Sequence, residues 1–419
     1  MINYNTMIVL VGASLLGASS GLVGAFAVLR RRALAGDALA HAALPGLCLA
    51  FLVLGERNLS AMLFGAFLTG LLGISVVSGL RHTTRIKEDA AIGIVLSVFY
   101  GAGIALSSFI QKQTAFGSKA GLHTYILGKT AGMILADVYL IGAASLFCLL
   151  LILVLYKEFK VVAFDSGFAS VQGWPSVLID LLLMAMIAVT VVIGLPAVGV
   201  VMMAALLIIP AASARFWTDR LGPMLGLSSL FGLTIGAVGT LMSASFSRLP
   251  AGPVIVMAGT IVFLVSLLAA PRRGIVARQL SARRERRQMA LRATCRALYE
   301  LLEAELPQVR PLEFDEILSH KSWQRQELAA CLTQLEKEGV ISRTAIGAFL
   351  LTEQGQKQVV ETVRLRRLSE LYQHQYGSFE GTLDELDAGT FIEELPRELV
   401  ATLEEELKSS GRFPAAGAV

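Results

Sequence analysis

Charged residues are scarce in this chain. Only 16% of its 419 residues are Asp, Glu, Lys or Arg, and 55% are apolar. A soluble domain averages about 25% charged and about 45–50% apolar residues, so an ordinary soluble fold is excluded for most of the chain. The four cysteines are widely scattered and form no CxxC pair, which argues against both a disulfide framework and a cysteine zinc site.

The shortage of charge is uneven along the chain. Up to Ala270 there are 15 Lys and Arg and 9 Asp and Glu, whereas the much shorter remainder has 21 and 23. This change predicts a membrane domain followed by a charged domain, with the boundary near residue 271. The net charge of +4 therefore arises in the membrane part and does not indicate nucleic-acid binding. The first apolar run has no basic residues before it and no small-residue cleavage site, so we interpret it as a retained span.

Nine apolar runs approach the roughly 20 residues that a membrane-spanning helix needs. They predict an all-α polytopic membrane protein of about nine spans. Eight spans is the alternative, because the two runs beside Gly194-Leu195-Pro196 are close enough to form one broken helix with a re-entrant piece. The predicted runs are 6–29, 37–54, 59–80, 90–109, 133–156, 177–195, 197–215, 222–243 and 252–270.

Basic residues orient the predicted spans. Up to Ala270, ten Lys and Arg side chains follow the first, third, fifth and seventh runs, and five lie in the opposite loops. Because cytoplasmic loops retain Lys and Arg, we expect the N-terminus outside and the C-terminal domain in the cytoplasm.

One pair of ionisable residues in a span suggests a metal site. Such residues are costly within a membrane and deserve a functional hypothesis. Asp37 and His41 are four residues apart, which puts them on one face of a helix, and a carboxylate with an imidazole suits Mn²⁺, Fe²⁺ or Zn²⁺. One helix offers only two ligands, whereas a two-fold dimer would supply four. The alternative is that Asp37 caps a helix beginning near Gly36 and that His41 bonds to a backbone carbonyl.

The run RRRALAGDALAHAALPG, which contains this pair, resembles the signature of the manganese/zinc/iron ABC permease family (ABC-3 type). The likeness covers nearly all of residues 1–270, and its further segments follow in the family's order. The resemblance implies that Asp37 and His41 are metal ligands. The further segments are 86–94, 125–128, 164–173 and 197–215.

The resemblance also implies cargo, partners and location. The cargo is Mn²⁺ or Fe²⁺ first and Zn²⁺ next, with no permanently bound cofactor. The partners are a cytoplasmic ABC ATPase, an extracytoplasmic metal-binding protein, the lipid bilayer and a second permease subunit of the same or a different chain. The location is the bacterial cytoplasmic membrane.

The loop at 157–175 is predicted to couple the permease to the ATPase. Its apolar residues are spaced for a short helix that docks in a groove; the alternative is an amphipathic loop on the membrane surface. The resemblance implies coupling roles for Phe164, Asp165, Phe168, Ala169 and Gly173.

The chain is not expected to be an enzyme. Gly128-Lys129-Thr130 looks like the end of a P-loop, but His123 stands where that motif needs glycine, and no strand precedes it. ATP hydrolysis is therefore assigned to a separate subunit. His123 and Asp137 flank the fifth predicted span on the outer side, where we interpret them as interfacial residues or, alternatively, as the lining of a vestibule.

In the charged C-terminal part, a helix at Trp323 to Glu338, ended by Gly339, and a hairpin around Gly347 predict a winged helix-turn-helix α+β domain. Residues 348–355 resemble the junction between wing and helix in such domains, and the stretch from 363–371 to 395–399 resembles the dimerisation region of the diphtheria-toxin-repressor/manganese-repressor family. The predicted segments are a basic juxtamembrane linker at 272–291, a winged-helix domain at 292–352, a helical dimerisation-like region at 353–410 and a disordered tail at 411–419.

The C-terminal part departs from that repressor family at its expected ligands. Arg366, Glu385 and Glu393 stand where histidines or other ligands are expected, which leaves Glu370 as a single candidate metal ligand. Candidate DNA contacts are Gln324, Arg325 and Lys337, but the slightly acidic balance argues against a nucleic-acid partner. We therefore favour a regulatory, packing or dimerising role for this part.

Two other functions compete with an ABC permease. One is a membrane-tethered, metal-responsive transcriptional regulator, although nine spans are more than an anchor needs. The other is a stand-alone secondary transporter, which would need no coupling loop.

Overall fold

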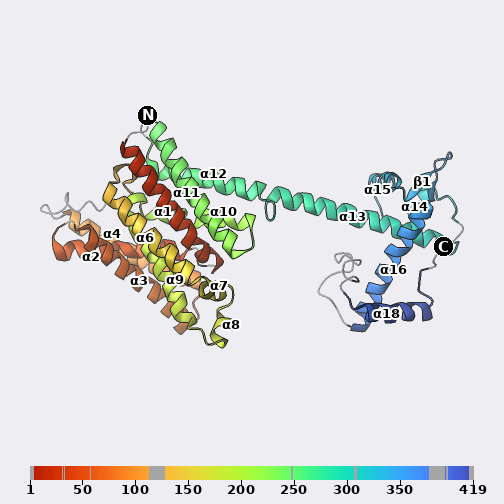
Figure 1. Ribbon diagram of the computed structural model, residues 1–419, viewed down its shortest axis with the longest axis horizontal. Coiled ribbons are helices and arrows are strands. Elements are labelled where there is room, and N and C mark those ends of the chain that lie inside the picture. The colour runs from red at the N-terminus through yellow and green to blue at the C-terminus, as the bar shows by residue number, and fades with distance from the viewer. Residues whose placement is uncertain are drawn as a thin grey trace. The chain divides into compact units, whose positions relative to one another are not determined.

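The structure is a computed structural model that describes residues 4–30, 32, 34–56, 58–112, 128–246, 249–305, 309–376, 392 and 395–414. The chain divides into two compact units, Met1–Arg278 and Gln279–Val419. Each unit is described separately below, with its elements labelled as in Figure 1.

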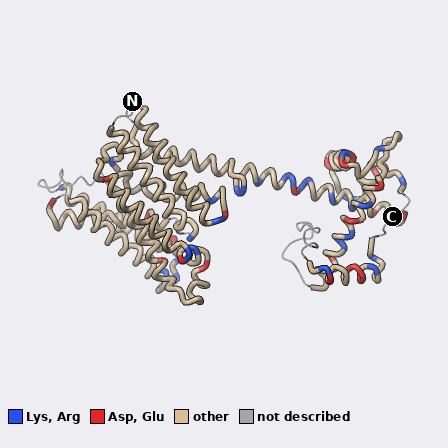
Figure 2. The backbone as a smooth tube through the Cα atoms, viewed as in Figure 1, with Lys and Arg blue, Asp and Glu red and all other residues tan. Residues whose placement is uncertain are grey.

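The first unit is entirely helical in its described residues. The charged residues lie mainly at helix ends and in the connections between helices, so the helices themselves are largely tan in Figure 2. Its elements are α1 Tyr4–Leu29, α2 Ala35–Leu54, α3 Leu59–Thr83, α4 Glu88–Lys112, the 3-10 turn η1 Thr130–Gly132, α6 Leu135–Val154, α7 Tyr156–Phe164, α8 Ser166–Val171, α9 Ser176–Val198, α10 Val200–Trp217, α11 Leu221–Ser245 and α12 Ala251–Ala269.

Eight of the described helices are long and apolar enough to cross a membrane, which confirms the prediction of a polytopic membrane protein. The seventh predicted run, 197–215, corresponds to α10, whose apolar part Met202–Trp217 is shorter. The helix before it is not broken at the proline, because α9 continues through Pro196 to Val198. Gly199, with φ +90°, is the single residue between α9 and α10.

Backbone contact between small residues holds α1 against α11. A Cβ atom added to Gly232 would lie 1.9 Å from the carbonyl oxygen of Gly17, and one added to Gly21 would lie 2.2 Å from that of Ser228. The Ser228 hydroxyl also donates to the Gly21 carbonyl at 2.5 Å. Lipid is as apolar as a side chain, so membrane helices associate through such close packing and hydrogen bonds.

A second set of contacts encloses α2. This helix packs against α3 and α4 and also touches α9 and α10. A Cβ atom added to Gly46 would lie 2.1 Å from the Gly65 carbonyl oxygen, so α2 and α3 also meet backbone to backbone. The helix is continuous through Pro45. The helix that carries Asp37 and His41 is therefore central to the unit and not a peripheral span.

The second unit combines helices with one small hairpin. Strands β1 (Ile341–Arg343) and β2 (Phe349–Leu351) pair antiparallel. Gly347 between them has φ +86°, and this confirms the predicted hairpin. Leu312 adds an isolated bridge to Phe349. The elements are α13 Ile275–Leu302 (which crosses the boundary between the units), α14 Phe314–His320, α15 Arg325–Lys337, β1 Ile341–Arg343, β2 Phe349–Leu351, α16 Glu353–Tyr376 and α18 Arg397–Ser409.

Two apolar cores lie in this unit. The larger one surrounds Tyr299 and Ile317, and the smaller one joins α16 to α18 through Leu368 and Leu403. Within the predicted disordered tail 411–419, Phe413 packs on the smaller core, and the last five residues lie outside the described ones.

Candidate metal site and coupling segment

Asp37 and His41 lie in the first two turns of α2 and face each other. His41 Nε2 is 3.4 Å from Asp37 Oδ1. Two ligands about 2.1 Å from one ion, at a tetrahedral angle, lie about 3.4 Å apart, so this separation suits one divalent cation held between the two side chains. The His41 side chain is 14% exposed and that of Asp37 is 31% exposed. The pair is therefore largely shielded from solvent but still accessible to an ion.

The surroundings fix the His41 ring. Its edge-to-face partner is Tyr100 on α4, at 4.7 Å between ring centroids. His41 Nδ1 is buried and has no hydrogen-bond partner among the described residues, although buried polar atoms nearly always have one. The sequence pattern does not predict that Tyr100 lies beside His41, because α4 meets α2 only in the folded bundle.

The alternative, in which Asp37 caps α2, receives no support from the described hydrogen bonds. The N-cap residue is Leu34, which makes no side-chain cap bond, and the Asp37 carboxylate instead lies beside the His41 ring. The described residues contain no group of three or more His, Cys, Asp or Glu side chains that could hold an ion. One chain therefore offers an incomplete ligand set at this pair.

The predicted coupling segment consists of two short helices, α7 and α8. The Asp165 carboxylate caps α8 by accepting from the Phe168 amide at 2.9 Å, and Gly173, with φ +83°, turns the chain after it. Phe164 and Phe168 are 57% and 53% exposed. Ala169 is fully buried, so it packs beneath α8 and does not belong to its exposed face.

The predicted coupling segment is anchored to α1 and α9. Phe159 of α7 packs edge-on against Phe26 of α1, with 5.7 Å between ring centroids. Arg30 donates to the Val162 carbonyl at 2.5 Å and pairs with Asp180 of α9 at 2.6 Å. Spacing along the sequence does not reveal this pair, because Arg30 and Asp180 are 150 residues apart.

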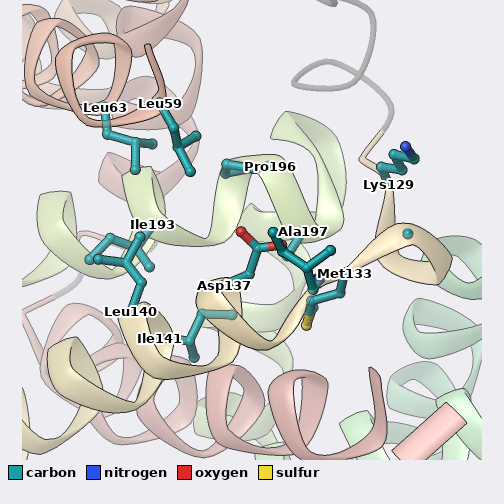
Figure 3. A pocket seen from close by; sticks show the side chains of 12 residues that line it. Leu59, Leu63, Lys129, Met133, Asp137, Leu140, Ile141, Ile193, Pro196 and Ala197 are labelled. Atoms are coloured by element: carbon teal, nitrogen blue, oxygen red, sulfur yellow. Dashed lines mark hydrogen bonds between the residues drawn. The ribbon is translucent and has the colours of Figure 1, made fainter. Parts of the chain in front are cut away.

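A cavity of about 320 Å³ lies at the ends of α3, α6 and α9 and is lined in part by Asp137. Figure 3 shows that the Lys129 side chain points away from the other lining side chains. The Asp137 carboxylate accepts from the Ile134 amide at 3.0 Å, so it caps α6. The other residue named for an outer vestibule, His123, lies outside the described residues, as do residues 125–127 of the predicted family segment.

The candidate ligands of the C-terminal unit are engaged elsewhere. Arg366 donates to Glu370 at 2.7 Å, so a guanidinium occupies the place where a metal cation would bind. Burial raises the pKa of the Cys295 thiol to about 12 and also raises the pKa of Cys331, so neither offers a thiolate at neutral pH. Glu385 and Glu393 lie outside the described residues.

The three candidate DNA contacts lie on or beside α15. Gln324 is its N-cap residue, and Arg325 pairs with Asp315 at 3.4 Å and lies over the Phe314 ring at 5.3 Å. Lys337 is exposed in the last turn. The exposed surface of the same helix also carries Glu327, Glu336 and other acidic neighbours, so it has no basic excess.

Comparison with known proteins identifies a matching family and several similar proteins. The model of the ABC 3 transport family matches residues 3–270. The manganese transport system membrane protein MntC of Bacillus subtilis is 39% identical over 416 residues, which span 98% of this chain and 93% of that protein. The zinc transport system membrane protein TroC of Treponema pallidum is 45% identical over 274 residues, which span 65% of this chain and 92% of that protein.

A solved structure resembles about two thirds of the chain. PsaBC from Streptococcus pneumoniae, in complex with Fab, aligns with a TM-score of 0.59 and 31% sequence identity. The alignment covers 67% of this chain and 96% of that one.

Proposed function

This chain belongs to the ABC 3 transport family, and from that premise we propose that it is the membrane permease subunit of an ATP-driven importer of a divalent transition metal. Manganese and iron are the first candidates for the cargo, and zinc is the next. The observation that carries the proposal is the alignment of 98% of the chain with a manganese transport membrane protein.

In this proposal Asp37 and His41 form the cargo site. Their 3.4 Å separation suits two ligands of one ion, and their oxygen and nitrogen donors suit Mn²⁺, Fe²⁺ and Zn²⁺. Because a single chain offers two ligands, a second permease subunit completes the coordination by bringing its own pair to the shared axis. The buried, unpartnered Nδ1 atom of His41 fits a ring that is not fully satisfied within one chain.

The transport cycle also needs partners outside the membrane. An extracytoplasmic binding protein delivers the ion, and a separate ATPase binds and hydrolyses ATP in the cytoplasm. The exposed faces of Phe164 and Phe168 dock in a groove of that ATPase. Movement of the ATPase then reaches the bundle through the contacts of α7 with α1 and α9.

Metal uptake tests the cargo site. Cells that express the chain with its ATPase and binding protein are given radioactive manganese, and the variants are Asp37→Ala and His41→Ala. Uptake is expected to fall at least about tenfold in each, since loss of even an outer partner of a metal ligand costs about that much. Asp89→Ala is the matched control, because Asp89 is an exposed carboxylate in the first turn of α4.

Immunoblots of the membrane fraction confirm that each variant is inserted in equal amount. Normal uptake in both Asp37→Ala and His41→Ala would remove the cargo site from the proposal while leaving the family assignment intact.

We assign the C-terminal unit a regulatory or dimerising role in the cytoplasm. The order of α14, α15 and the β1–β2 hairpin, with its bridge to Leu312, supports a winged-helix domain. The amphipathic helix α18 packing on α16 supports a dimerisation region.

The mixed charge of α15 argues against the alternative function, a membrane-tethered transcriptional regulator. A gel-shift at low salt, where non-specific DNA binding is strongest, tests this; a shift with the purified full chain would favour that regulator.

A further inference from the structure

Four arginine side chains converge on one cavity of the first unit. The cavity measures about 540 Å³, and its apolar lining includes Val28, Leu29 and Ala163. Phe164 and Ser166, at the junction of α7 and α8, also line it. The arginines are Arg30, Arg32, Arg81 and Arg215, and we refer to this space as the four-arginine cavity.

The arginines come from four places in the chain. Arg30 and Arg32 follow α1, Arg81 lies at the end of α3 and Arg215 lies in the last turn of α10. All four belong to connections that are predicted to be cytoplasmic. A basic residue at each helix end is ordinary for a membrane protein, but convergence of four on one cavity is not required by that rule.

Three of these arginines lie near carboxylates that are not part of the cavity lining. Among its described lining residues the cavity has no Asp or Glu. Asp180 serves both Arg30 and Arg32, at 2.6 and 2.7 Å. Asp219 is 4.0 Å from Arg215 but only 2.5 Å from Arg273, so Arg273 is its main partner. Arg30 and Arg32 are also largely sheltered, with side chains 13% and 16% exposed.

Guanidinium groups in such a cavity are suited to a phosphate group. Their planar forks bind phosphate oxygens in pairs, and basic pockets between membrane helices on the cytoplasmic side bind anionic lipid headgroups. We propose that the four-arginine cavity binds a phosphate group, carried by the headgroup of an anionic phospholipid or present as free phosphate. The Ser166 hydroxyl adds a neutral donor beside the coupling segment.

Native mass spectrometry of the full chain in neutral-detergent micelles tests the proposal. The micelles contain either phosphatidylglycerol or phosphatidylcholine with the same acyl chains, and a third arm adds inorganic phosphate alone. The variants are Arg81→Gln and Arg215→Gln, and the matched control is Lys160→Gln. Lys160 is an exposed cation in α7 that does not line the cavity.

We expect phosphatidylglycerol to bind more tightly than phosphatidylcholine, and each arginine variant to weaken that binding about tenfold, the loss of one charge-assisted hydrogen bond. Lys160→Gln should bind as the parent chain does. Arg215→Lys should fall between the parent and Arg215→Gln, because it keeps the charge and loses the fork. Equal melting temperatures in phosphatidylcholine micelles confirm that the variants fold.

Inorganic phosphate that binds alone, with the same dependence on Arg81 and Arg215, supports the phosphate site and assigns it to the free ion. Binding of either ligand that ignores Arg81 and Arg215, or that falls equally with Lys160→Gln, overturns the proposal. The proposal is also overturned if the arginine variants change only the association of the ATPase, since the cavity would then receive an acidic protein surface.

Discussion

At the scale of the residue, Asp180 is the carboxylate that holds the chain after α1. It pairs with Arg30 at 2.6 Å and with Arg32 at 2.7 Å, and 22% of its side chain is exposed. The backbone of Arg32 in turn accepts from the Ala35 amide at 3.0 Å, two residues before Asp37. The same carboxylate therefore positions both the anchor of the coupling segment and the start of the helix that carries the candidate cargo site.

Asp180→Asn should destabilise the first unit. Removing one partner of a buried pair costs about 3–5 kcal/mol, and we expect about half of that because the Asp180 carboxylate is partly exposed. Thermal unfolding of the detergent-purified chain measures the loss. Asp219→Asn is the control: its carboxylate is 43% exposed, so its loss should cost below about 1 kcal/mol. Equal losses would contradict this account.

Sequence spacing could predict the Asp37–His41 pair because both residues belong to one helix, where a separation of four residues fixes their proximity. It could not predict Tyr100 beside His41, or Asp180 beside Arg30, because these contacts depend on which helices pack together. The burial of Ala169 has the same origin, since residue type alone does not reveal which side of α8 faces the bundle.

At the scale of the element, α1 and α11 have almost no free space between them. Gly17 and Gly232 face each other across the contact, and each would place a Cβ atom within 2.1 Å of the other's carbonyl oxygen. Backbone atoms cannot rotate away as side chains do, so a methyl group at either position must separate the helices.

Gly232→Ala should therefore lower stability by about 1–3 kcal/mol, as overpacking does in a dense interior. Gly226→Ala on the same helix is the matched control, because an added Cβ there meets nothing within 4 Å. That change should be neutral or stabilising by up to about 1 kcal/mol, the difference in helix propensity. Thermal unfolding distinguishes the two, and a harmless Gly232→Ala would contradict the close contact.

The short helix α8 carries the element-scale prediction for ATPase coupling. Phe168→Ala removes an exposed aromatic side chain without disturbing the core, so folding should be retained. Binding of the ATPase should weaken about tenfold or more, as for other aromatic anchors at interfaces. Co-purification of the ATPase and uptake of metal measure this. Phe147→Ala is the control, because Phe147 is exposed to a similar extent, 55%, but lies in α6. Unchanged ATPase binding in Phe168→Ala would remove Phe168 from the docking face.

At the scale of the whole molecule, the scarcity of charge predicted the polytopic membrane class, and the structure bears this out with eight helices long and apolar enough to span. The sequence could not predict which of those helices pack against each other. Gly17 contacts Gly232 across more than two hundred residues, and small residues occur in nearly every predicted span, so no single partner stood out.

Removal of the C-terminal unit is the whole-molecule prediction. A chain that ends after Arg278 should still insert and import metal, because the match to TroC covers 92% of that protein and only 65% of this chain. Manganese uptake at matched membrane levels measures this. Loss of uptake in a well-inserted truncated chain would mean that the C-terminal unit is required for transport and is not an added regulator.

The close contact between α1 and α11 also bears on how the bundle moves. With backbone against backbone, we expect the two helices to move together as one rigid body during a transport cycle. The contact between α2 and α10 is different, because the flexible Leu207 side chain lies against Gly36 and can change rotamer. We therefore expect the hinge of alternating access at the border of α2 with α10, next to the Asp37–His41 pair.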